Sequence, residues 1–442
     1  MHNPRFSRLD DQTPRGVRLN WPRAASFAIL GLVLVWLIVS RSFVAYLAAT
    51  APEAALLLRP GDPTALIGLA DQEFNANDKD KREKPEKSSA GARSLSRLQE
   101  QVETALAADP LNARAYRLLG QLAEAEGDAS RTAKLMQTAA RLSLNETIAV
   151  EWMMRKSFAN EDYPATAFYA DALLRTRPQL MDYASPILGR MAENKDAKRE
   201  IEKLLAADPP WRSQFFAALG KAITDARTPL ELFLSLKDTA APPTPADVHA
   251  YLAFLFQHKL YDFAYYVWLQ FLPPEQLGSA GFLFNGGFES KPSGALFDWT
   301  MPQGKGVIVD IAPRPEASDK RALFLEFGQG RVDFPGVYQT TVLPPGAYRL
   351  KGSFKGEIIG PRGMQWSISC VGGAAIGASQ MFLGSYPVWR DFEFDFVVPE
   401  TGCRAQSARL ALAARSASEQ LVSGSIWFDE LSISRQPAEP TK

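Results

Sequence analysis

Histidine and cysteine, which often serve as general bases, nucleophiles and metal ligands, are scarce in this 442-residue chain. The chain has three histidines and two cysteines, and it contains no G-x-S-x-G, H-E-x-x-H, phosphate-loop or G-x-G-x-x-G motif. Acidic residues are plentiful, but no pair is marked as the two fixed carboxylates that a glycosidase needs. These residues favour binding over catalysis. A polysaccharide lyase on a β-sandwich stays as an alternative.

The charge balance excludes one class of partner. Lys and Arg number 49 and Asp and Glu number 49, so the formal net charge is zero, whereas a general nucleic-acid binder carries a basic excess. Hydrophobic residues make up 46% and charged residues 22%, which is typical of a folded chain. The length predicts two or more domains.

An apolar segment near the N-terminus predicts a membrane anchor. Residues 24–40, AASFAILGLVLVWLIVS, carry no charge, and the run resumes after Arg41. Five arginines precede this segment against two aspartates. The positive-inside rule then places a tail over 1–23 in the cytoplasm, a single span over 24–48 in the inner membrane, and the bulk of the chain in the periplasm. A cleaved signal peptide with a site at Ala49-Thr50-Ala51 is the alternative.

The region 53–277 has helical periodicity and repeats. Pro110, Leu144 and Pro178 end similar segments at a spacing of 34 residues, the period of two-helix solenoid repeats. A charged insert over 77–93 is predicted to be a solvated loop. Near the end of this region lies an aromatic cluster that we expect to pack against the following domain rather than to form an exposed partner site: Tyr261, Phe263, Tyr265, Tyr266, Trp268 and Phe271.

The unit over 113–146 resembles a tetratricopeptide repeat. Its matching residues are Tyr116, Leu119, Gly120 and Ala123 in the first helix, Gly127-Asp128 at the turn, and Thr132, Met136 and Ala139 in the second helix. The next unit departs from the pattern, with Val150 and Met154 in place of Tyr116 and Gly120. The resemblance implies an α-solenoid whose concave face engages a protein partner.

Beyond a Pro- and Gly-rich hinge, short alternating runs over 282–435 predict an antiparallel β-sandwich. In WRDFEFDFVV (389–398) the phenylalanines are expected to face the core and the acids to face water or a ligand groove. Cys370 and Cys403 lie beyond the predicted span, in a compartment that permits a disulfide. We predict that they are bridged, with two buried free thiols as the alternative.

The motifs of this region, in order, resemble the galactose-binding-like jelly roll of many carbohydrate-binding modules: FLFNGGFES (282–290), Phe297-Asp298-Trp299, PGAYRL (345–350), Trp389 and IWFDELSI (426–433). The resemblance implies a structural calcium at Glu289 and Asp429, and the alternative is that each acid caps a strand end. It also implies stacking of sugar rings on exposed aromatic side chains, for which Trp299 and Tyr386 are the candidates. Trp366 and Trp389 are expected in the core.

The predicted architecture is therefore a transmembrane helix, an α-solenoid of helix pairs and a C-terminal jelly roll. We expect a non-catalytic periplasmic adaptor, with a protein partner on the repeats and a polysaccharide or second protein on the jelly roll. By analogy, its setting is the assembly or export of exopolysaccharide or another envelope polysaccharide. A purely structural scaffold and a glycan-modifying enzyme of another type are the alternatives.

Overall fold

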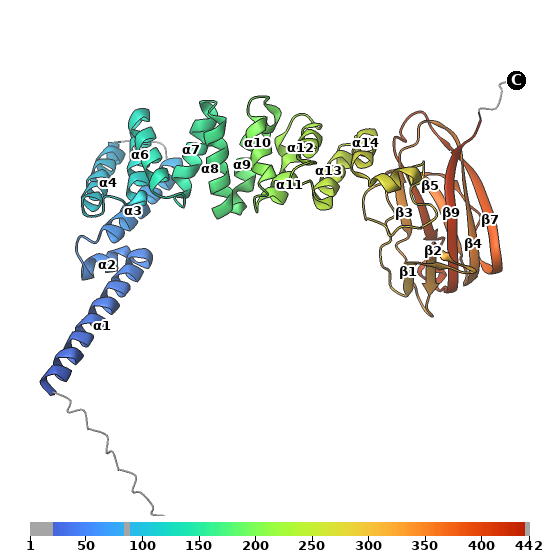
Figure 1. Cartoon of the computed structure of the whole chain (residues 1–442), viewed down its shortest axis with the longest axis horizontal. Helices are drawn as coiled ribbons and strands as arrows, with labels where there is room; N and C mark the ends of the chain where they lie inside the picture. The colour runs from blue at the N-terminus through green and yellow to red at the C-terminus, as the bar shows by residue number, and fades with distance from the viewer. Residues whose placement is uncertain (1–20, 84–88, 438–442) are drawn as a thin grey trace, which may run out of the picture. The chain divides into compact units, whose positions relative to one another are not determined.

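The structure is a computed structural model that describes residues 21–83 and 89–437, without the side chains of 21–24 and 77–93. It divides into two compact units, Met1–Thr176 and Arg177–Lys442, and each is described by itself (Figure 1). The predicted fold class is confirmed, because an apolar N-terminal helix and a helical region precede an antiparallel sandwich. The predicted tail over 1–23 lies almost entirely outside the described residues.

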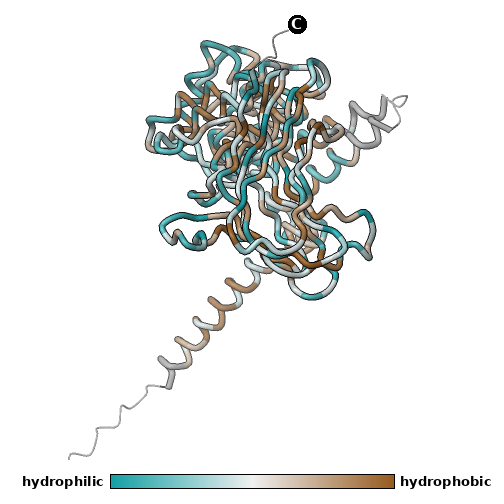
Figure 2. The backbone as a smooth tube through the Cα atoms, turned by 90° about the vertical axis from the view of Figure 1, so that its right-hand side faces the viewer, coloured by the Kyte–Doolittle hydropathy of each residue, from teal (hydrophilic) through white to brown (hydrophobic). Residues whose placement is uncertain are grey.

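The first helix, α1 (Trp21–Thr50), is long and apolar enough to cross a membrane. Its segment Ala25–Thr50 contains 26 residues, and at 1.5 Å per residue these exceed the roughly 20 residues that a bilayer core requires. Hydrophobic residues predominate along α1 in Figure 2, and those of its apolar window are exposed. A membrane anchor and a signal sequence both have this form.

Seven further helices of the first unit are described. They are α2 (Pro52–Leu58), α3 (Pro63–Glu83), α4 (Ser89–Ala108), α5 (Ala113–Glu126), α6 (Ala129–Leu142), α7 (Thr147–Ala159) and α8 (Tyr163–Thr176). The loop predicted over 77–93 is wrong where the backbone is described, because α3 continues to Glu83 and α4 begins at Ser89. The balanced charges of this insert fit a solvated helix as well as a solvated loop.

Two of these helix pairs have the same turn, 34 residues apart. Gly127 ends α5 in the left-handed conformation with φ of 83°, and Glu161 takes the equivalent place after α7 with φ of 59°. The side chains of Asp128 and Asp162 then accept backbone N–H groups at the start of α6 and α8. The predicted 34-residue period therefore corresponds to helix pairs over 113–142 and 147–176.

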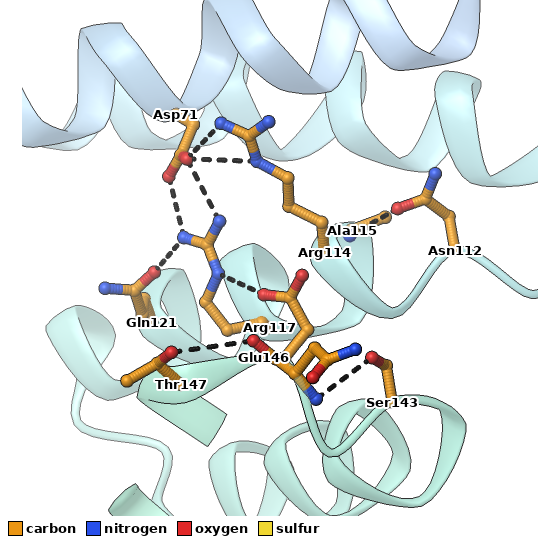
Figure 3. A network of polar contacts seen from close by, with 10 residues as sticks. Asp71, Asn112, Arg114, Ala115, Arg117, Gln121, Ser143, Glu146 and Thr147 are labelled. Atoms are coloured by element: carbon orange, nitrogen blue, oxygen red, sulfur yellow. Dashed lines mark hydrogen bonds and ion pairs between the residues drawn. The ribbon is translucent and has the colours of Figure 1, made fainter. Parts of the chain in front are cut away.

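A buried polar network joins three helices of the first unit (Figure 3). Arg117 on α5 donates from Nη1 and Nη2 to the two carboxylate oxygens of Asp71 on α3, at 2.7 and 3.0 Å. Arg114 adds a contact of 2.7 Å to the same carboxylate, and Arg117 Nε lies 3.5 Å from the carboxylate of Glu146, which precedes α7. Gln121 accepts another hydrogen bond from Arg117 at 2.6 Å.

The second unit begins with helices that the sequence grouped with the first. These are α9 (Met181–Glu193), α10 (Lys198–Ala206), α11 (Arg212–Ala222), α12 (Thr228–Leu236), α13 (Pro245–Gln257) and α14 (Tyr261–Phe271). We predicted one helical domain over 53–277, whereas the division at Thr176 places these six helices with the sandwich. Aromatic contacts between α14 and the segment that follows it are one physical reason for this grouping.

On α14, Trp268 packs edge-on against Phe284, with ring centroids 5.0 Å apart, and Tyr265 packs in the same way against Phe297 at 5.3 Å. Trp268, Phe284 and Phe297 are buried. The expectation that the aromatic cluster packs against the following domain is therefore confirmed for Trp268 and Tyr265. Tyr266 instead is 65% exposed, because it points away from that contact.

The sandwich consists of two antiparallel sheets. Its strands are β1 (Val307–Arg314), β2 (Ala317–Phe327), β3 (Val337–Thr341), β4 (Gly346–Ile359), β5 (Met364–Cys370), β6 (Ala375–Ala378), β7 (Gly384–Val398), β8 (Gln406–Leu412) and β9 (Ser423–Arg435). One sheet has the order β1-β2-β9-β4-β7 and the other β3-β8-β5-β6. Alternate residues of both sheets form a single buried core between them.

The alternation predicted for β7 is present. Phe392 and Phe396 are buried, while Glu393 and Asp395 are exposed on the outer face and are paired with Arg349 of β4. On the other sheet, Cys370 at the end of β5 is joined to Cys403, which lies shortly before β8, by a disulfide with an S–S distance of 1.99 Å. The bridge closes a loop over the sequence separation of 33 residues.

Candidate functional site

Trp299, one of the two predicted sugar-binding residues, is part of the core. Its exposed fraction is 0%, and its indole N–H donates to the carbonyl of Asn285 at 3.0 Å. The ring packs against Phe288 and Trp366, with centroids 5.1 and 5.7 Å away. The prediction that Trp299 is exposed is wrong, because the turn after Phe297-Asp298 directs the indole inward. Trp366 is buried, as expected.

Tyr386, the second predicted residue, is half-buried on β7 but has no open ring face. Its hydroxyl donates to the carbonyl of Leu383 at 3.0 Å, and its ring meets Phe354 of the core at a centroid distance of 4.8 Å. The guanidinium of Arg390 lies over the ring at 5.3 Å. A sugar would have to displace this cation in order to stack on Tyr386.

Trp389 was expected in the core and instead lies on the outer face of the five-stranded sheet. It is half-buried, and the guanidinium of Arg314 stacks over its indole at 4.2 Å. Arg314 is the last residue of β1, and the turn that follows it is held to this sheet by an ion pair of 2.6 Å between Glu316 and Lys355 of β4. The ring of Trp389 is therefore covered by a residue of the same domain.

The two acids predicted to bind calcium lie near each other, but Asp429 is paired with a cation of the protein itself. Asp429 is buried, and its Oδ2 lies 2.5 Å from Nη1 of Arg314, which also contacts Glu430 at 2.7 Å. Asp429 Oδ1 accepts the backbone N–H of Glu430 at 2.6 Å. Glu289 is exposed, and its charge acts on Asp429.

These contacts do not fit the predicted calcium. A calcium ion needs six to eight oxygen ligands, and both oxygens of Asp429 are already engaged. Among the described residues no group of three or more acidic, histidine or cysteine side chains is placed to hold a metal. Burial raises the pKa of Asp429 above its ordinary value, and the nearby charges of Glu430 and Glu289 add to this rise against the opposing charge of Arg314.

A pair of aromatic rings on the outer face of the five-stranded sheet was missed by the sequence reading. Phe324 of β2 and Trp427 of β9 are directly opposite in the strand register, and their ring centroids lie 4.3 Å apart with the planes tilted by 35°. Both are half-buried. The period-two pattern contained the signal, because Phe324 alternates with Leu323 and Leu325, which face the core.

Other outward rings of the sandwich differ from this pair in being covered by arginine. Trp389, Tyr386 and Tyr338 have the guanidiniums of Arg314, Arg390 and Arg409 over them, respectively. Among the described residues, no such cation–π contact is found at Phe324 or Trp427. The neighbouring strands place a charged residue beside each ring: Asp310 of β1 is opposite Phe324, and Lys355 of β4 is opposite Trp427. These four residues form a row across the outer face of the sheet.

A cleft of about 760 Å³ adjoins the row at the edge strand β1. Asp310 lines the cleft as well as the row, and Glu289, Lys291 and Arg321 supply the other charged groups. Met301 and neighbouring prolines contribute its apolar wall. The volume lies in the range of small-molecule sites, and two acids with two bases give it acceptors and donors without a large net charge.

Comparison with known proteins gives structural neighbours for the sandwich alone. No family model and no curated protein matches the chain, so the tetratricopeptide resemblance stays a prediction. The carbohydrate-binding module TmCBM61, solved with β-1,4-galactotriose, is 19% identical, covers 36% of this chain and 100% of its own, and has a TM-score of 0.26. A CBM4 structure is 18% identical over 35% of this chain and 99% of its own, also with a TM-score of 0.26.

A family 16 carbohydrate-binding module is 16% identical, covers 35% of this chain and 100% of its own, and has a TM-score of 0.25. These neighbours are carbohydrate-binding modules by title. Because the TM-scores are low, the description of the domain as a two-sheet jelly roll rests on its own strand order and register.

Proposed function

We propose that this chain is a membrane-anchored adaptor outside the cytoplasm that binds a polysaccharide through the outer face of its five-stranded sheet. The helical repeats hold a protein partner, and the setting is the assembly or export of exopolysaccharide or another envelope polysaccharide. The observation that carries the sugar-binding part is the half-buried ring pair Phe324 and Trp427, which among the described residues has no arginine over it. The apolar helix α1 supports the anchor.

The chemistry of the face suits a sugar polymer. A pyranose presents apolar C–H faces and a rim of hydroxyls, so it binds where an aromatic surface is flanked by donors and acceptors. Phe324 and Trp427 supply the surface, and Asp310 and the ion pair of Lys355 with Glu316 lie beside them. Because Asp310 also lines the cleft, a chain crossing the rings can place one end there.

The test is binding of the full chain, in detergent micelles, to a panel of neutral and acidic polysaccharides. Trp427→Ala and Phe324→Ala should each weaken binding about tenfold or more, which is about 1.4 kcal/mol, as for an aromatic residue at the centre of an interface. Tyr338→Ala is the matched control, since its ring lies on the other sheet beneath Arg409 and should leave binding unchanged.

Two results would contradict the proposal. Binding that survives in both Ala variants would remove the ring pair as the site. Release of shortened glycans by the unmodified chain would show an enzyme instead of a binding protein.

A second candidate function is a structural cap for the helices. It is favoured by the packing of Trp268 and Tyr265 on Phe284 and Phe297, which joins the sandwich to α14 without any ligand. Failure of the wild-type chain to bind any glycan of the panel, with a folded sandwich by circular dichroism, would support this candidate.

A further inference from the structure

The short helix α2 (Pro52–Leu58) has a buried face and exposes two leucines to the outside of the protein. Its sequence is PEAALLL, with Glu53 as the sole charged side chain. One face is buried in the protein: Ala55 has an exposed fraction of 0% and packs with Ala48 of α1 and Ala65 of α3. The exposed side carries Leu57 and Leu58, which are 86% and 58% exposed, together with the exposed Glu53.

The buried face fixes how α2 is oriented. A helix advances by about 100° per residue, so Leu57 lies almost opposite the direction of Pro52 and Ala55, with the exposed Glu53 about 40° away from it, and Leu58 lies at about 90° to that direction. α2 packs against both α1 and α3. In Figure 1 it lies across the end of α1, with α3 on the side away from α1. The exposed leucines therefore lie on the face of α2 that is not covered by α3.

The position of α2 in the chain identifies what covers this face. Only Ala51 separates α2 from α1, and the last turns of α1 expose Phe43 and Tyr46 by 54% and 65%. Aromatic side chains of this kind are enriched where a spanning helix meets the headgroups. A helix that is hydrophobic all round is normally buried, and α2 packs on the end of α1 through Ala48 and Ala55.

We propose that α2 lies in the membrane–water interface and inserts Leu57 and Leu58 among the lipids, so that the first unit is held against the bilayer surface. This rests on the proposed function, because it requires α1 to span the membrane. The charged end of α2 supports it: Arg59 follows Leu58 directly, its side chain is 57% exposed, and its Nη1 lies 3.8 Å from Asp62 Oδ2, a surface contact that lipid phosphates can replace.

The experiment places an environment-sensitive fluorophore at single introduced cysteines of the full chain, in vesicles of phosphatidylethanolamine and phosphatidylglycerol. Cys370 and Cys403 are bridged and do not react without reductant. The test sites are Leu57→Cys and Leu58→Cys, whose high exposure leaves the fold intact. Val35→Cys reports on α1, and Leu111→Cys is the matched control, because Leu111 is 75% exposed between α4 and α5.

The expected result is that iodide quenches the probes at Leu57 and Leu58 several-fold less than the probe at Leu111, while nitroxide-labelled lipids quench them and not Leu111. A shielded Val35 with a Leu57 probe as exposed as Leu111 would overturn the inference and leave the anchor standing. A Val35 probe open to iodide would overturn the anchor as well. Leu57 shielded from iodide but insensitive to nitroxide lipids would show a protein surface, such as a second copy, instead of lipid.

Discussion

Each unit of this protein contains a buried aspartate that is paired with arginine, but the two sites differ in the number of arginines for each carboxylate. In the helical unit, one carboxylate, Asp71, receives two guanidiniums, from Arg114 and Arg117. In the sandwich, one guanidinium, Arg314, is shared between the carboxylates of Asp429 and Glu430.

The pKa directions follow from this ratio. Burial opposes ionisation of Asp71, but hydrogen bonds and charge from Arg117 and Arg114 outweigh it, and its pKa is lowered. Burial also opposes ionisation of Asp429, and there a single arginine does not compensate, so its pKa is raised. The same side-chain pairing therefore stabilises the charged form in one unit and leaves it costly in the other.

The largest effect is expected when the pair in the helical unit is broken. Arg117→Met leaves the buried carboxylate of Asp71 with Arg114 alone and should cost about 3–5 kcal/mol. Hydrogen exchange of α3 and α5, followed by mass spectrometry, measures this locally. In the control, Arg97→Met removes an exposed pair with Glu73 and should cost at most about 1 kcal/mol. Equal effects of the two variants would contradict the importance of burial.

A smaller effect compares the two aspartates directly at neutral pH. Asp71→Asn removes charge-assisted hydrogen bonds to two arginines and should lower stability by about 2–3 kcal/mol. Asp429→Asn should change it by less than about 1 kcal/mol, because the amide avoids the cost of a buried charge while Arg314 keeps Glu430 and Trp389. Chemical denaturation of each variant gives both values, and a larger loss for Asp429→Asn would invert the comparison.

The contributions of Asp71 and Asp429 to the free energy of unfolding should depend on pH with opposite signs. Because the pKa of Asp71 is lowered, its contribution is complete above the ordinary value of about 4 and is lost as the pH falls through the lowered value. Because the pKa of Asp429 is raised, its ionisation costs stability at neutral pH, and that cost is relieved as the pH falls through the raised value. As the pH falls, Asp71→Asn should reduce the loss of unfolding free energy that the wild-type chain shows. Asp429→Asn should abolish the gain of unfolding free energy that comes from protonation of Asp429. Chemical denaturation at a series of acidic pH values measures both effects.

The smallest effect concerns calcium. With Arg314 on Asp429, the melting temperature of the wild-type chain should not change when EDTA or calcium is added. A fall with EDTA, reversed by calcium, would restore the metal site that the sequence predicted at Glu289 and Asp429.

Patterns of local origin were predictable from the sequence. The apolar run of α1, the 34-residue spacing of the helix pairs and the alternating strand segments of the sandwich follow from hydrophobic periodicity and turn residues, which act over a few residues. The charged insert at 77–93 was misread because balanced charges suit a solvated helix and a loop equally. Phe324 and Trp427 could have been found from the alternation of β2 and β9.

The sequence alone thus determined the order of an apolar helix, a helical region and a sandwich, since these depend on the side chains next to one another in the chain. Tertiary structure alone decided which tryptophan is exposed, which arginine lies on Asp429 and which face of α2 is free. Trp299 and Trp427 both stand in apolar strand-like contexts, and Arg314 lies more than a hundred residues before Asp429. Such contacts depend on how distant strands are registered and how the β1–β2 turn is held to the sheet, and local pattern does not encode that.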